Sequence, residues 1–93
     1  MSTLNDKAGS LYAYIDKSSK LGDLKAYSKR LESKLDTIDA NISMCELLDC
    51  PGTANVLAEQ YNEVNLKKIK VDLEINKIEK DLLEFELNAA TAE

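Results

Sequence analysis

Apolar residues recur with coiled-coil spacing over the second half of the chain. Downstream of Thr53 they advance in steps of three, four or seven residues, as the positions of a heptad seam do. Lys68 fills the gap within the seven-residue step, and neither Pro nor Gly interrupts the run. This spacing predicts a long helix over residues 54–90, whose seam comprises Leu57, Tyr61, Val64, Val71, Ile75, Ile78, Leu82, Phe85 and Ala89.

A matching seam precedes it in the chain. Its apolar residues also step by three, four or seven, and Ser28 stands in the one wide gap. The pattern predicts a helix over residues 23–48 with a seam of Leu24, Leu31, Leu35, Ile38, Ile42 and Cys45.

The stretch SMCELLDCPGTANV, residues 43–56, separates the two predicted helices. Pro51 cannot donate a backbone hydrogen bond, and Gly52 tolerates the left-handed backbone of a tight reversal. Thr53 is a suitable residue to cap the start of the next helix. Because a short link forces neighbouring helices to run antiparallel, a turn at residues 49–53 predicts a helical hairpin. The numbers of facing residues should then add to about 102, which pairs Leu24 with Ile78, Leu31 with Val71 and Ile38 with Val64.

Residues 1–22 have helical spacing of their own. Leu4, Ala8, Leu11 and Ile15 recur every three or four residues, but in a phase that the following leucines do not continue. The slip falls near Gly22, a residue that weakens helices. The segment is therefore either a separate short helix or the start of one long helix with a change of phase.

The second helix carries more apolar surface than a hairpin buries. Five residues lie off its seam, on nearly the opposite side, in a stripe that Asn76 and Lys80 interrupt. Either the N-terminal segment folds over this stripe or another protein chain covers it, and the second alternative predicts a homo-oligomer, a dimer or larger. We call these residues the outer stripe: Leu66, Ile69, Leu73, Leu83 and Leu87.

Tyr12 and Tyr14 make the segment LYAYI the most aromatic of the chain. One interpretation is that they pack at the open end of the hairpin, which the composition favours. The other is that they belong to a docking interface, because Tyr brings both apolar area and a polar tip to interfaces.

Composition and charge narrow the class of protein. The 93 residues suffice for one small domain, and their net charge of −5 disfavours binding to the phosphate backbone of nucleic acids. No apolar run approaches the roughly 20 residues that span a bilayer, and the N-terminal residues lack the pattern of a signal peptide. We therefore expect a cytoplasmic protein of bacterial, viral or eukaryotic origin. The early part of the chain is basic and the rest acidic, so antiparallel pairing should place Lys17, Lys20 and Lys25 beside Glu79, Asp81, Glu84 and Glu86.

Two cysteines are the only candidates for a metal or redox site. A structural zinc site needs four ligands, usually Cys or His, and the chain has no His. Two chains could pool their thiolates, and a disulfide between Cys45 and Cys50 would need an oxidising compartment. The spacing and position do not match the usual Cys-x-x-Cys redox motif. We expect two reduced thiols, with Cys45 as a small apolar seam residue, and neither a metal nor a cofactor.

The sequence predicts an all-α protein without enzymatic activity. Without His it lacks the commonest general base, and no phosphate-binding loop or nucleophile motif is present. The expected function is binding of a client protein by a small self-associating hairpin that acts as a chaperone, adaptor or assembly factor. The alternatives are an acidic inhibitor that imitates nucleic acid and a structural subunit of a phage or secretion assembly.

Overall fold

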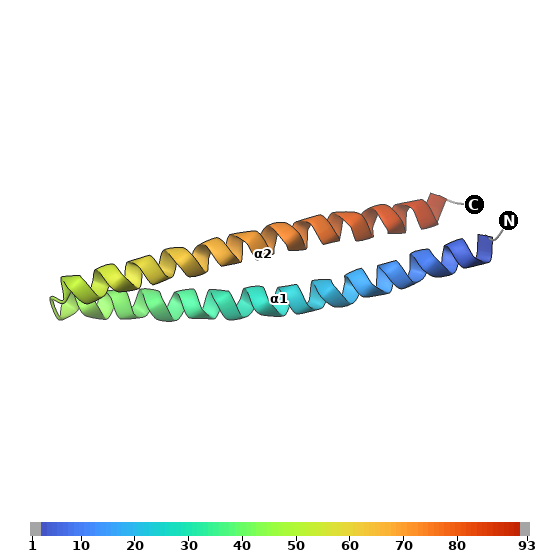
Figure 1. Ribbon diagram of the computed structural model, residues 1–93. Coiled ribbons are helices and arrows are strands. Elements are labelled where there is room, and N and C mark those ends of the chain that lie inside the picture. The colour runs from blue at the N-terminus through green and yellow to red at the C-terminus, as the bar shows by residue number, and fades with distance from the viewer. Residues whose placement is uncertain (1–2, 92–93) are drawn as a thin grey trace.

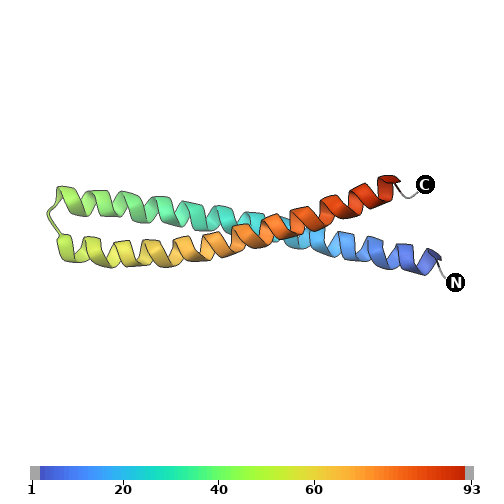
Figure 2. The ribbon, with the colours of Figure 1, turned by 90° about the horizontal axis from the view of Figure 1, so that it is seen from above.

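The protein is a hairpin of two long helices. The computed structural model describes the backbone of residues 3–91 and the side chains of residues 9–91. Helix α1 spans Thr3–Leu47 and helix α2 spans Pro51–Thr91. The helices lie side by side and antiparallel, so that the start of α1 and the end of α2 lie at one end of the rod and the bend lies at the other (Figure 1). The rod measures 71 × 19 × 14 Å. Seen from above, one helix crosses over the other (Figure 2).

A hydrogen-bonded bend of three residues joins the helices. The amide of Cys50 donates to the carbonyl of Cys45 at 2.8 Å, and that of Asp49 donates to Glu46 at 3.3 Å. These two bonds form a Schellman motif, in which the residue after the helix takes a left-handed conformation. That residue is Asp49, whose φ is 57°.

The second helix starts earlier than the sequence indicated. It begins at Pro51 rather than residue 54, and the amide of Ala54 donates to the carbonyl of Cys50 at 3.0 Å. Pro is well suited to the first position of a helix, where its missing N–H would have no partner. Gly52, which the sequence suggested as a residue suited to the reversal, is helical, and Asp49 makes the reversal instead.

Helix α1 is continuous through Gly22. The seam extends upstream through Leu24, Leu21 and Tyr14, which are half-buried, whereas Leu11 and Ile15 are exposed. One Gly inside a helix costs about 1 kcal/mol, which packing along a seam of this length offsets. The alternative of a separate short helix is therefore wrong. The predicted residues Leu4 and Ala8 lie outside the described side chains.

The core follows the predicted seams. A continuous cluster near the bend joins residues of both helices, with Val71, Ile42, Leu57 and Tyr61 packed against it. Among the described side chains none is fully shielded, because two helices cover only one side of each other. All of the buried apolar residues are predicted seam positions: Leu31, Leu35, Ile38, Val64, Ile75, Ile78 and Leu82.

The register differs slightly from the expected one. The hydroxyl of Tyr14 donates to Glu86 at 2.8 Å and that of Ser28 to Asp72 at 2.6 Å, so facing residue numbers add to about 100 rather than 102. The difference arises because α2 starts at Pro51 and the bend is centred near Asp49.

Ion pairs between the helices match the predicted charge pattern in part. Lys17 contacts Asp81 at 3.3 Å and Lys25 contacts Glu79 at 3.5 Å, as expected. Lys20 pairs instead with Glu74 at 3.3 Å, one turn closer to the bend than the predicted acids. These pairs are solvent-exposed, so they select the antiparallel register more than they stabilise it.

Candidate interaction surface

A polar network interrupts the seam near the middle of the hairpin. Ser28 and Lys68, the residues in the gaps of the two predicted seams, both bind the carboxylate of Asp72. Its Oδ1 accepts from Ser28 at 2.6 Å and its Oδ2 from Lys68 Nζ at 2.7 Å. The side chain of Lys68 is 24% exposed, so its stem lies along the seam while its ammonium reaches the edge.

The network shifts the titration of both charged groups. The hydrogen bond from Lys68, with a second from Ser28, lowers the pKa of Asp72 below its usual value. The same bond to Asp72 raises the pKa of Lys68. Lys68 and Asp72 therefore carry opposite charges at neutral pH. Both charged groups of the network are thus held by hydrogen bonds within the chain.

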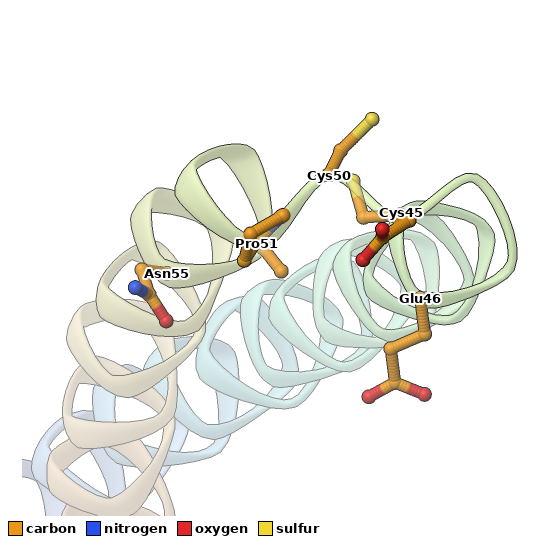
Figure 3. Close-up of a pocket in the computed structure, with 7 residues that line it drawn as sticks. Cys45, Glu46, Cys50, Pro51 and Asn55 are labelled. Atoms are coloured by element: carbon orange, nitrogen blue, oxygen red, sulfur yellow. The ribbon is translucent and has the colours of Figure 1, made fainter.

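The bend holds both thiols beside a shallow hollow of about 300 Å³ (Figure 3). Both cysteines are free; Cys45 is half-buried and Cys50 is exposed, with its thiol 3.6 Å from the carbonyl of Leu48. Over the described residues no cluster of three or more His, Cys, Asp or Glu side chains is arranged to hold a metal ion. We assign the bend a structural role as the connection between the helices.

The two tyrosines of the candidate docking segment have different environments. The ring of Tyr14 lies 4.9 Å from that of Phe85, and its hydroxyl bond to Glu86 raises the pKa of the phenol. Tyr14 thus packs at the open end of the hairpin, as one interpretation predicted. Tyr12 is 69% exposed and remains available to a partner.

The outer stripe is exposed along α2. Helix α1 does not fold back over it, so the described residues leave it uncovered and the alternative of intrachain cover is wrong. Its five side chains are between 47% and 62% exposed: Leu66 58%, Ile69 47%, Leu73 62%, Leu83 56% and Leu87 56%. Exposed leucines occurring singly are common, whereas several apolar residues on one helix face make this surface a candidate for interaction.

Two polar residues belong to the outer stripe. Asn76 and Lys80 were interpreted as interruptions, yet both fall on the three-and-four spacing that the apolar members follow, and Ala90 continues it. All three are exposed. The row from Leu66 to Ala90 is thus a complete heptad seam with a polar centre, and this signal is present in the sequence.

Within residues 3–91 neither helix contains a stretch of the length and hydropathy that a bilayer-spanning segment requires. Comparisons of the chain with protein-family models, with curated proteins and with solved structures find no match.

Proposed function

We propose that this protein is a non-enzymatic interaction module, a coiled-coil hairpin that self-associates and binds other polypeptides as a chaperone, adaptor or assembly factor. The observation that carries the proposal is the outer stripe, a heptad-spaced apolar row that stays about half exposed along α2. A helix with an apolar face on each side needs a second partner besides α1. The proposal includes a cytoplasmic location, where Cys45 and Cys50 would stay reduced.

The charge distribution argues against the alternative of an acidic inhibitor. Imitation of nucleic acid needs a row of unpaired acids that a basic groove can bind. Four acids of α2 are instead paired with lysines of the same chain at 2.7–3.5 Å: Asp72, Glu74, Glu79 and Asp81. The same pairing and the net charge of −5 disfavour direct binding to nucleic acid.

Sedimentation equilibrium tests the proposal directly. The chain should form a dimer or larger oligomer at micromolar concentration, and Leu73→Lys should shift it toward monomer because a charge then enters the apolar row. Leu47→Lys is the matched control, since Leu47 is 80% exposed and lies on α1, away from the outer stripe. A wild-type mass of 10.3 kDa at the highest concentrations would refute self-association.

A further inference from the structure

The partner of the outer stripe follows from its own residue pattern, if the proposed function holds. We propose that the outer stripe packs antiparallel against the outer stripe of a second copy of this chain, with the two-fold axis level with Ile78. The proposal deepens the general one by naming the occupant, the direction and the register.

The spacing of the row requires a helical partner. From Leu66 to Ala90 the row advances by alternating steps of three and four residues, the spacing that keeps a seam facing one neighbouring helix. It extends about 36 Å along α2 and lies roughly 150° around the helix from the seam that α1 occupies. Helix α1 therefore does not obstruct a second helix at this face.

The order of apolar and polar residues selects one antiparallel register. With the axis level with Ile78, Leu73 faces Leu83 of the second copy. Further out, Ile69 faces Leu87 and Leu66 faces Ala90, so both residues of each of these layers are apolar. At the centre Asn76 faces Lys80 of the second copy, whose ammonium can donate to the amide oxygen.

Neighbouring antiparallel registers do not pair apolar residues with apolar ones and polar residues with polar ones. A shift by one heptad in either direction places the ammonium of Lys80 against Leu83 or Ile69 of the second copy, and Asn76 against Leu87 or Leu73. A polar group facing an apolar layer loses its partner and costs free energy. The central polar pair thus fixes the register, as single polar seam residues do in coiled coils.

Flanking charges do not select this arrangement. Beside the axis Lys77 lies level with Lys77 of the second copy, and on the other side Glu79 lies level with Glu79; one heptad further out, only the pair of Lys70 with Glu84 joins opposite charges. The acids are partly neutralised within their own chain, since Lys25 contacts Glu79 at 3.5 Å. The apolar layers and the central polar pair therefore carry the register.

A parallel pair is less favourable. In register it would place Lys80 against Lys80 within the seam, where like charges destabilise the pair. Its flanks are balanced, because Glu79 lies beside Glu84 of the second copy while Asp72 lies beside Lys77. Either pair uses the same surface on both chains and forms a closed dimer rather than an open filament.

Disulfide trapping between two single-cysteine variants tests the direction and register. Leu73→Cys and Leu83→Cys are each made in a Cys45→Ala, Cys50→Ser background, and circular dichroism confirms that each variant is helical. One variant is isotope-labelled, and the two are mixed and equilibrated in a glutathione redox buffer. Mass spectrometry then separates the mixed disulfide from the two symmetric ones.

The proposed register predicts that the mixed disulfide exceeds each symmetric disulfide by about tenfold, because only residues 73 and 83 of different chains come within bonding distance. Mixing Leu73→Cys with Val56→Cys is the control. Val56 is 54% exposed and lies outside the row, so this mixture should show no preferred disulfide.

The other outcomes overturn the proposal in distinguishable ways. Predominantly symmetric disulfides would mean a parallel pair, and a statistical mixture in an oligomeric sample would mean another register or surface. Both results leave the proposed function standing. A statistical mixture together with a monomeric mass in sedimentation would remove both the antiparallel dimer and the self-associating function.

Discussion

Truncation of Leu35 to Ala measures how much the seam between α1 and α2 stabilises the hairpin. Leu35 is 7% exposed and belongs to the buried cluster near the bend. The change removes three carbon atoms, each worth about 0.8 kcal/mol when buried, or about 2.4 kcal/mol in total. Cavity formation adds to this loss in closed cores, but two helices leave the site open at its edges and free to relax. We expect a loss of about 2–3 kcal/mol in the free energy of unfolding.

Urea unfolding followed by circular dichroism at one protein concentration gives this difference. The matched control is Leu47→Ala, because Leu47 is 80% exposed and the same truncation there should cost about 0.5 kcal/mol. If the two variants lose equal stability, Leu35 does not lie in the dominant apolar contact and the assigned seam is wrong. In a chain of this size a loss of 2–3 kcal/mol is a large part of the total, so partial unfolding in the absence of urea is also expected.

Five further substitutions test the bend, the polar network and the thiols. Asp49→Gly should raise the free energy of unfolding by about 0.5–1 kcal/mol, since Gly accepts a left-handed φ without strain; a loss in urea unfolding would mean that the carboxylate supports the bend. Lys68→Leu should raise the melting temperature by completing the seam and leave the oligomer mass unchanged in light scattering, and a changed mass would assign Lys68 to the choice of assembly. The lowered pKa of Asp72 means that its stabilising effect is complete above the unfolded value of about 3.9 and disappears as the pH falls through the lower folded value. Asp72→Asn should therefore lose less stability than wild type between pH 5 and pH 2, and identical acid titration curves would contradict the network. Cys45→Ser should cost about 1 kcal/mol by placing a hydroxyl on the seam, Cys50→Ser should leave melting unchanged, and unfolding by a chelator would indicate a shared zinc site.

Most of the fold was accessible from the sequence because heptad spacing carries long-range information. The steps of three and four residues located both helices and all of the buried residues, and the link of a few residues dictated an antiparallel hairpin. The outer stripe was predicted from the same rule. Its polar members Asn76 and Lys80 were assigned to the stripe only once the complete spacing was considered.

Local signals were less reliable where tertiary packing competes with them. Gly22 suggested a helix boundary, but a penalty of about 1 kcal/mol is small beside a continuous seam. Pro51 and Gly52 suggested the centre of the turn, yet Pro can start a helix as well as end one. The left-handed residue Asp49 gave no distinctive signal, since Asp adopts this conformation less often than Gly. Because the turn was expected at residues 49–53 rather than around Asp49, the residue expected to face each position was about two positions away from the one that does.

The polar network at Asp72 divides the hairpin into two parts that can open separately. The cluster on the bend side ends near Val71 and Leu31, and the buried Ile75, Ile78 and Leu82 lie beyond the break. Chain connectivity holds the bend-side part together after opening, whereas the other part must close a loop of more than 40 residues to reform its contacts. Amide hydrogens beyond the network should accordingly exchange through partial openings, while those near Leu35 and Ile38 exchange only when the whole hairpin unfolds. Refolding would then proceed from the bend outward, with the contact between Tyr14 and Phe85 formed last.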